Sequence, residues 1–546
     1  MVIGKVPIQH ARASKGRMSL IKIQNFTVYK RQSFFRILYG ALLAIIGIVM
    51  IAINPIELIT NHILTIREGS FLYHVWEDLP YEICTETWVY NYTNVPEYLS
   101  GEDKVLKLQE IGPFVYREVR TNKNITIDSD RGVMTFNPNI ELEFIREKSI
   151  ADPKDVELHM PNVAVIAMST LFADKLSYFI NSGVYYSIKT IGSQLFRKMT
   201  ADEILWGYDD NIVKVVNKLL PGWIDFQKLG ILDRIYAKKH DEIEVELGDI
   251  SKKFTLNEWN GSPGIIEQGF KDLNTSTTCN RIKGVYEGLL YAPNMPTDRV
   301  IEIHRRAACR ILPFHFQKQT DEKFGFNYYR YTIDRTAYDN TSEYVCKCKY
   351  NCLPNGFVDI GNCYYGFPIV LSQPHMLDAD PVQRSYYEGM NPDPEKHVSY
   401  LNIVPSIGVP LSLQISMQVN LAVRMSEGNP ITEPIKDKIL PILWFSLSCK
   451  SPPPKILTLL NLRFKIGPPL LITVEILLLI IGAVLGIHGF YRIYKPRYRL
   501  VEYNPSHTEL QEGDYKNNAF IRNDKAYKDE PSENCTITLL STQLPD

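Results

Sequence analysis

The chain has 546 residues, a formal net charge of −1 and an apolar content of 45%. Nearly balanced charge gives no basis for binding nucleic acid, because the basic excess lies only in short segments flanking two apolar runs. The length is ample for a large folded domain with its own core. An aromatic content of 11% favours β-strands over an all-helical array.

The first 36 residues are basic and contain neither Asp nor Glu. An apolar run from Ile37 to Ile53 follows at once and closes on Asn54-Pro55. A one-sided basic flank is held in the cytoplasm during membrane insertion. A cleaved signal peptide is the alternative, but the apolar run starts late and no small-residue cleavage site follows it. We predict a cytoplasmic tail over 1–36 and a transmembrane helix over 37–59.

A longer apolar run, Ile466–Phe490, lies near the other end of the chain. At ~1.5 Å per residue it can cross a ~30 Å hydrocarbon core as a helix. A buried soluble helix is the alternative, but such helices rarely sustain so long a run with so few charges. Basic residues follow the run, so we predict a transmembrane helix over 466–490 and a disordered cytoplasmic tail over 491–546.

Small residues in both predicted spans permit close helix approach: Gly482 and Gly486 in the second, Gly40 and Ala44 in the first. They would serve either pairing of the two spans or a homo-oligomer. Glu475 is costly in lipid unless protonated or paired, so we expect it to face the partner helix.

The segment 60–465 would form an ectodomain outside the cell or in a lumen. Strand-like runs with Gly112-Pro113 as a turn precede a helical stretch at about 157–220, and strands dominate again after Phe254. The helical stretch would pack on the sheet or form an exposed cap that binds a partner. A long alternating strand, Val409–Arg424, has an uncharged polar face that suits a tunnel wall and equally a solvated sheet face.

Six of the nine cysteines fall in one window. In an oxidising compartment a disulfide cluster is favoured over a zinc site, and six cysteines allow fifteen pairings. Cys84 and Cys449 would pair or stay as buried thiols. Glycosylation sequons in the predicted ectodomain start at Asn91, Asn124, Asn260, Asn274 and Asn340.

Sequence motifs of hydrolases, metalloproteases, nucleotide-binding proteins and thiol oxidoreductases are absent from the chain. We therefore predict no catalytic residue, no metal ligand and no cofactor. The chain is predicted not to be an enzyme.

Several segments resemble the class B scavenger receptor family, and they occur in that family's order. The resemblance covers about residues 35–490 and rests on these stretches: Asn91–Val119, Glu203–Asp210 (EILWGYDD), Asn355–Cys363 (NGFVDIGNC), Glu388–Leu411 and Pro441–Phe445 (PILWF).

The resemblance implies an α+β ectodomain: an irregular antiparallel β-barrel with a helical-bundle cap and an internal hydrophobic tunnel, anchored by two transmembrane helices. It also implies the disulfides Cys279–Cys346, Cys309–Cys363 and Cys348–Cys352. The cap lysines that contact ligand in some members are not matched at the same positions; Lys175, Lys189 and Lys198 are the nearest candidates.

The implied function is a scavenger-type receptor that binds lipids, fatty acids or lipoproteins. It would pass cargo such as a fatty acid, sterol ester or carotenoid through the tunnel to the membrane. The implied location is the plasma membrane, with the lysosomal membrane as the alternative. Alternative functions are a sensory co-receptor for lipophilic odorants and a lysosomal lipid or cargo receptor.

Overall fold

The computed structural model describes residues 18–22, 26–171, 173, 177–237, 240–348, 352–495 and 498–502. Contacts within the chain divide it into two units. One unit is Ala44–Ile480, and the other combines Met1–Leu43 with Ile481–Asp546. The first unit holds the sheet, the cap helices and the cavities described below.

The sheet of the Ala44–Ile480 unit follows a single path of antiparallel pairings through eleven strands. In path order the strands are β8 (Leu256–Trp259), β7 (Ile243–Glu246), β4 (Val133–Phe144), β3 (Leu106–Asp128), β2 (Ile83–Tyr92), β17 (Ile439–Cys449), β16 (Val409–Ala422), β15 (Tyr400–Val404), β11 (Tyr328–Ile333), β10 (Arg310–Thr320) and β9 (Ile301–Arg305).

Three short strands complete the sheet beside this path. β13 (Ile369–Ser372) pairs with β16 and carries β12 (Val358–Asp359), and β14 (Tyr387–Glu388) pairs in parallel with β3. Tyr286 forms isolated bridges to Thr255, next to one end of the path, and to Ile303 of β9 at the other end. Among the described strands no ladder joins β8 to β9, so the sheet itself does not close into a barrel.

Gly112-Pro113, expected as a turn, lies inside β3, and that prediction is wrong. The register between β2 and β3 shifts between Thr87 and Val89, so the chain passes through a bulge instead of reversing. Gly112 has a φ of 156°, and a Cβ there would lie 2.6 Å from Trp88 Cδ1. Only glycine fits this close approach to the indole.

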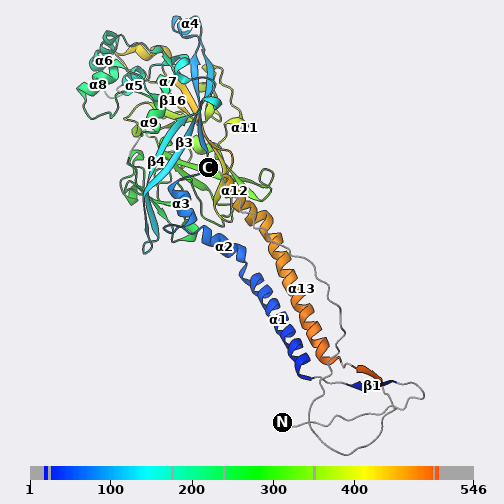
Figure 1. Ribbon diagram of the computed structural model, residues 1–546. Coiled ribbons are helices and arrows are strands. Elements are labelled where there is room, and N and C mark those ends of the chain that lie inside the picture. The colour runs from blue at the N-terminus through cyan, green and yellow to red at the C-terminus, as the bar shows by residue number, and fades with distance from the viewer. Residues whose placement is uncertain are drawn as a thin grey trace, which may run out of the picture. The chain divides into compact units, whose positions relative to one another are not determined.

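The predicted helical stretch contains helices at one end of the sheet together with a two-stranded ribbon (Figure 1). Its elements are β5 (Glu157–Pro161), α5 (Val163–Leu171), α6 (Tyr178–Ile191), β6 (Phe196–Thr200), α7 (Ala201–Trp206) and α8 (Asn211–Leu219). The other helices of this unit's periphery are α4 (Val95–Ser100), α9 (Ile231–Ile235), α10 (Pro381–Ser385) and α11 (Pro394–His397).

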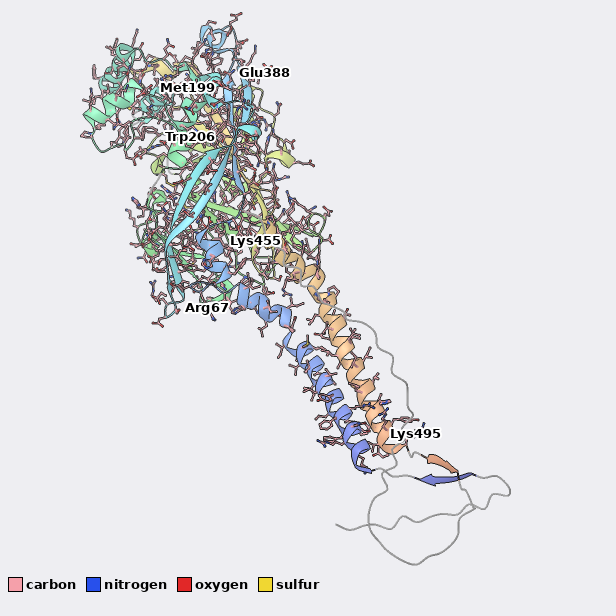
Figure 2. All side chains as sticks on the ribbon, viewed as in Figure 1. Arg67, Met199, Trp206, Glu388, Lys455 and Lys495 are labelled. Carbon is pink, nitrogen blue, oxygen red and sulfur yellow. A yellow bond between two sulfur atoms is a disulfide. The ribbon has the colours of Figure 1, made fainter. Side chains whose placement is uncertain are left out.

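Local sequence signals set the boundaries of α7 and α8. Thr200 and Glu203 form a capping box that starts α7, and Asp210 accepts a hydrogen bond from Ile212 N–H to start α8. Between them, Gly207 at φ 122° ends α7. In Figure 2, Trp206 of α7 lies beside the long strands, and its indole N–H donates to Tyr116 Oη of β3 at 2.9 Å.

A second group of helices gathers at the opposite end of the sheet (Figure 1). These are α2 (Pro55–Ile63), α3 (Phe71–Glu77) and α12 (Pro454–Asn461), which continues through a π-helical turn, Leu462–Ile466, into α13 (Gly467–Tyr494). Gly467 is needed at this turn, because a Cβ there would lie 2.5 Å from Leu462 O and 3.0 Å from Ile56 Cδ1.

Two helices are long and apolar enough to cross a membrane, Lys30–Ile53 within α1 (Phe26–Ile53) and the Pro454–Tyr494 helix. The first helix ends at Ile53 instead of continuing to residue 59. Asn54 is left-handed at φ 48°, because Pro55 excludes the helical conformation from the residue before it. The apolar segment is thus broken into α1 and α2.

In the unit formed by the two ends of the chain, Gly40 of α1 packs against the glycines of α13. A Cβ at position 40 would lie 2.6 Å from Gly482 O and 2.9 Å from Gly486 N. In the same unit, β1 (Met18–Lys22) pairs antiparallel with β18 (Tyr498–Glu502). β18 lies inside the C-terminal tail that was predicted to be disordered. Residues 496, 497 and 503–546 of that predicted tail lie outside the described residues.

Candidate functional site

An apolar cavity of about 400 Å³ lies where α2, α3 and α12 meet the end of the sheet. A volume of this size is within the range of small-molecule sites. The lining comes from five separate stretches of the chain: Met50–Leu64, Phe71–Tyr81, Leu289 with Leu290, Ile407 with Val409, and Ile456–Val474. Aliphatic and aromatic side chains dominate it, so the cavity suits an apolar occupant.

Two smaller apolar cavities lie further along β16. A cavity of about 20 Å³ is lined by Leu411 and Leu413, and one of about 50 Å³ by Val419 and Leu421. Val409, at the start of the same strand, lines the 400 Å³ cavity. At ~3.3 Å per residue, Val409 and Leu421 are about 40 Å apart along the strand. One strand therefore borders all three cavities.

Buried side chains separate these cavities. Ile415 and Met417 lie on β16 between the residues that line the 20 Å³ and 50 Å³ cavities, and they are 3% and 2% exposed. The cavities are thus segments in a row, and a continuous tunnel is not open in this structure. The 50 Å³ cavity reaches the cap end of the sheet, where Val163 of α5 is part of its lining.

The cap exposes large apolar side chains on α6 and at the end of α8. Phe179 is 84% exposed, Tyr186 65% and Leu219 74%. α6 contacts both α5 and α8. Exposed apolar side chains grouped on one element mark surfaces that meet a partner or a membrane.

Of the predicted cap lysines, Lys189 and Lys198 are exposed. Lys189 belongs to α6, with its Nζ 5.8 Å from the ring centroid of Tyr185. Lys198 belongs to β6, opposite His159 of β5. Lys175 lies outside the described residues. Their role in ligand binding stays a prediction.

The polar face of β16 is buried and hydrogen-bonded, which is neither of the two expected arrangements. Gln418 and Asn420 are 0% exposed. Gln418 Oε1 accepts from Tyr90 Oη at 2.8 Å and from His375 N–H at 2.7 Å, and its Nε2 donates to Asn420 Oδ1 at 2.7 Å. This face packs against the chain around His375 and His397, so no tunnel wall or solvated surface is formed there.

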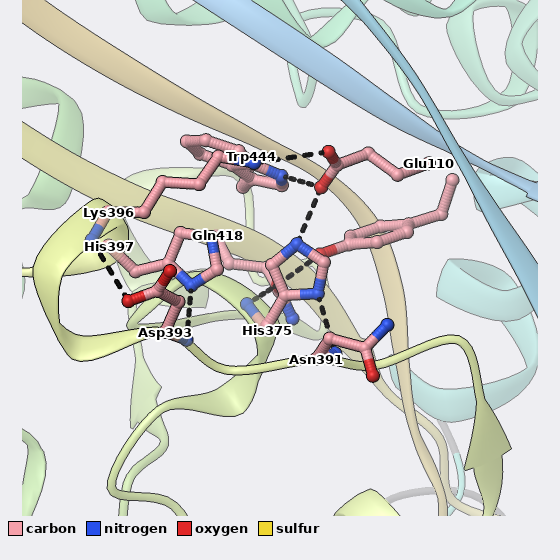
Figure 3. A network of polar contacts seen from close by, with 9 residues as sticks. Glu110, His375, Asn391, Asp393, Lys396, His397, Gln418 and Trp444 are labelled. Atoms are coloured by element: carbon pink, nitrogen blue, oxygen red, sulfur yellow. Dashed lines mark hydrogen bonds and ion pairs between the residues drawn. The ribbon is translucent and has the colours of Figure 1, made fainter.

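Glu110 is the acidic centre of this network (Figure 3). Its Oε2 accepts from Trp444 Nε1 at 2.8 Å and contacts His375 Nε2 at 2.5 Å, and Lys396 Nζ lies 3.6 Å from Oε1. Burial raises the pKa of Glu110, but the hydrogen bonds from His375 and Trp444 outweigh burial and lower this pKa to about 2. Glu110 is therefore ionised at neutral pH.

The two histidines of the network are stacked, with ring centroids 4.6 Å apart. His375 Nδ1 accepts from Asn391 N–H at 3.1 Å, and His397 Nδ1 accepts from Asp393 N–H at 3.0 Å. Both rings must carry their proton on Nε2 to keep these bonds. Burial is the main cause that lowers the pKa of His397 to about 4.

No local signal in the sequence marks this network. Glu110 is 265 positions away from His375 in the sequence and 334 positions away from Trp444. Glu110 was not identified from the sequence, because an acidic residue within a strand is indistinguishable from a solvated one until its partners are known.

The six clustered cysteines are paired as the family resemblance implies. The structure contains Cys279–Cys346, Cys309–Cys363 and Cys348–Cys352, with Cα–Cα distances of 5.2, 6.3 and 5.6 Å. Cys84 and Cys449 are buried thiols. They lie on neighbouring strands where Cys84 faces Ser448, so Cys449, one residue further along β17, points to the opposite face of the sheet.

The asparagine side chains of the sequons differ in their exposure to solvent and in their hydrogen bonds. Asn124, Asn260, Asn274 and Asn340 are exposed, and Asn91 is half-buried, with Oδ1 accepting from His159 N–H. The Asn260 side chain donates to Asp241 Oδ1 and accepts from Glu242 N–H. A glycan at Asn260 would have to be accommodated beside these two bonds, whereas Asn274 needs no such adjustment.

Among the described residues, no group of three His, Cys, Asp or Glu side chains could hold a metal ion. The Glu110–His375 pair does not neighbour a Ser, Cys or Thr nucleophile in the contacts described above. The apolar cavities are the arrangement that suits an apolar ligand.

Comparison with known proteins gives one consistent result. The CD36 family model matches residues 38–493. Scavenger receptor class B member 1 of Cricetulus griseus is 30% identical over 416 residues, which cover 75% of this chain and 79% of that protein. The same receptor of Mus musculus is 30% identical over 420 residues, with the same coverage.

A second kind of relative is lysosome membrane protein 2 of Homo sapiens, 28% identical over 393 residues that cover 70% of this chain and 78% of that protein. The family match thus extends from the first apolar helix to the end of the second and includes every cavity-lining stretch. On this evidence of sequence and structure, the chain belongs to the CD36 family.

Proposed function

We propose that this protein is a scavenger-type membrane receptor that binds lipids or lipoproteins and passes a hydrophobic cargo molecule to the membrane. The observation that carries the proposal is the row of apolar cavities along β16, which ends in the 400 Å³ cavity beside the helices α2, α12 and α13. Similarity to scavenger receptor class B member 1 supports the same assignment.

Cargo would enter at the cap and leave at the membrane helices. The exposed side chains Phe179, Tyr186 and Leu219 would receive the lipid or lipoprotein particle, with Lys189 and Lys198 nearby on the same cap. An internal tunnel would then open along β16 when Ile415 and Met417 move aside. Keeping an acyl chain out of water is favourable by ~0.8 kcal/mol per CH₂, so transfer needs no cofactor and no chemical step.

The proposed topology places the ectodomain, 60–465, outside the cell, with spans near 37–59 and 466–490 and both tails in the cytoplasm. The plasma membrane is the proposed location. A lysosomal location is the alternative, which similarity to lysosome membrane protein 2 supports. The chain would act as a receptor and not as an enzyme.

Blocking the row between its cavities tests the proposal. Leu289 lines both the 20 Å³ and the 400 Å³ cavity, so Leu289→Trp places an indole at their junction, with room for it in the larger cavity. In cells expressing the full-length protein, we expect uptake of a labelled fatty acid or cholesteryl ester from lipoproteins to fall several-fold while particle binding stays unchanged.

Leu273→Trp is the matched control, because Leu273 is 76% exposed and lines none of these cavities. Uptake by this variant should equal that of the wild type. Equal uptake by Leu289→Trp and the wild type, at equal surface expression, would rule out passage along the row of cavities.

A further inference from the structure

Arg310, the first residue of β10, is a buried cation without an acidic partner. Its side chain is 3% exposed, and it forms no ion pair with any residue that the structure describes. Burial lowers the pKa of this guanidinium to about 10, whereas a neighbouring carboxylate would raise it. The group is still protonated at neutral pH, so a full positive charge lies inside the protein.

The protein satisfies only part of this guanidinium. Nη2 donates to Ala337 O at 2.6 Å and to Tyr344 O at 3.2 Å. Nε and Nη1 have no hydrogen-bond partner in the described part of the chain. Buried N–H groups are nearly always hydrogen-bonded, so these donors point to a bound group that accepts from them.

The aromatic ring beside the guanidinium carries a further unpartnered donor. The ring centroid of Tyr338 lies 5.1 Å from the guanidinium carbon of Arg310, and Tyr338 is 1% exposed. Its hydroxyl also has no hydrogen-bond partner among the described residues. Two neighbouring buried side chains thus hold N–H and O–H donors that a single acceptor placed between them would satisfy.

The carboxylates of the surrounding chain are already engaged elsewhere. Both oxygens of Glu302 accept from Arg281 Nη2 at 2.6 Å, and Oε1 also accepts from Tyr344 Oη at 2.8 Å. Asp334 and Asp339 accept from backbone N–H groups and threonine hydroxyls. These contacts leave the buried guanidinium without a counter-ion from the described chain.

A small anion meets these requirements better than water or an organic acid. Water would accept from the donors but would leave the charge uncompensated, and an uncompensated buried charge is strongly destabilising. A bulky carboxylate or phosphate would not fit beside side chains that are only 3% and 1% exposed. A single-atom anion makes the smallest demand on space and supplies both the acceptor and the negative charge.

We propose that Arg310 and Tyr338 form a binding site for one small monovalent anion of the size of chloride. The anion would connect β10 to the one-turn 3₁₀-helix Arg335–Tyr338, next to the Cys309–Cys363 disulfide. Neither Arg310 nor Tyr338 lines the cavities along β16, so this site is independent of the proposed cargo transfer.

Thermal unfolding of the full-length protein in nanodiscs tests the site, with chloride replaced by gluconate at constant ionic strength. Gluconate has the same charge but is too bulky for a buried site. We expect the unfolding midpoint to rise with chloride concentration, by about 2 °C at ten times the dissociation constant, because the anion binds only the folded state. The same unfolding midpoint in both salts would overturn the proposal.

Two variants and a control locate the effect. Tyr338→Phe keeps the buried ring but removes one donor, so chloride should act at about tenfold higher concentration. Arg310→Met should abolish the chloride dependence. Arg330→Met is the matched control and should respond as the wild type does, because Arg330 also lies over a tyrosine ring, 4.0 Å from the centroid of Tyr400, but is only half-buried. A wild-type chloride response in Tyr338→Phe and Arg310→Met would contradict the assignment.

Anomalous scattering from bromide in crystals of the wild-type protein gives a second measurement, which does not depend on the folding of any variant. We expect a bromide ion within hydrogen-bonding distance of Arg310 and Tyr338. A water molecule at this position would overturn the proposal. Bromide at this position without any chloride effect on unfolding would mark an adventitious ion only, and would overturn it too.

Discussion

The two faces of β16 show how one strand supports two different kinds of structure. Its apolar face borders cavities of about 400, 20 and 50 Å³, whereas its polar face contains Gln418 and Asn420 in a fully buried hydrogen-bond network. Apolar contacts are non-directional, so an apolar face can leave space unfilled at the cost of lost packing. A buried polar face cannot, because each donor and acceptor needs its partner.

This contrast explains why the path for cargo would run on one side only. An acyl chain sliding past Gln418 would break bonds to Tyr90 and His375 that it cannot replace. Sliding past Met417 exchanges one apolar contact for another. The polar face therefore fixes the position of the strand, and the apolar face remains adaptable.

The largest expected effect is on the polar face. Gln418→Leu keeps the size of the side chain but leaves Tyr90 Oη, His375 N–H and Asn420 Oδ1 without their partner. We expect the free energy of unfolding to fall by about 4 kcal/mol, since each buried unsatisfied group costs ~1–3 kcal/mol. Urea unfolding of the full-length protein in nanodiscs measures this.

Gln414→Leu provides the matched control on the same face of the same strand. Gln414 is half-buried, so water can replace its bond to Lys396 O, and the loss should stay below about 1 kcal/mol. Equal losses in the two variants would show that burial of the polar face does not decide its energetics.

A smaller effect is expected on the apolar face. Met417→Ala removes a side chain that is 2% exposed, between two existing cavities, and should destabilise the protein by about 3 kcal/mol. It should also speed cargo transfer, because one of the two side chains that separate the cavities is shortened. Met425→Ala, at a position 39% exposed, should change neither quantity. A slower transfer in Met417→Ala would contradict the adaptable role of this face.

The smallest effect is the pH dependence contributed by His397. Its folded-state pKa, about 4, lies below the ordinary value of 6.5, so between pH 6.5 and 4 the unfolded chain takes up a proton that the folded protein does not. Stability is therefore full above pH 6.5 and falls as the pH drops toward 4, on the order of 2 kcal/mol in total.

His397→Asn tests this contribution, because the amide oxygen can still accept from Asp393 N–H but does not titrate. The decline in unfolding free energy between pH 6.5 and 4 should shrink by most of that amount. His74→Asn, at a side chain 65% exposed, should leave the decline unchanged. The same decline in wild type and His397→Asn would exclude His397 as its source.

Patterns along the chain predicted the parts of this structure that depend on neighbouring residues. The two apolar runs and the alternation of Val409–Arg424 are of this kind, and the family resemblance added the cysteine pairing seen in the structure. A single residue could still alter a local prediction. Asn54 before Pro55 ends the first helix early, and Gly207 separates α7 from α8 inside the stretch predicted to be helical.

The cavities and the polar network could not be predicted in this way, because their members are distant in sequence. Leu289 and Ile456 meet only when α12 packs on the sheet end, and Glu110 and His375 meet although 265 positions separate them. Alternation showed that β16 has two unlike faces. It could not show which of them the rest of the chain would cover.

The contact of Gly40 with Gly482 and Gly486 has a consequence for assembly. A helix surface stripped of side chains can accommodate one neighbour at such close range, and on α13 that neighbour is α1 of the same chain. Gly482 is buried, so a second copy that used Gly482 would have to displace α1 first. Pairing within the chain and self-association through Gly482 are therefore mutually exclusive.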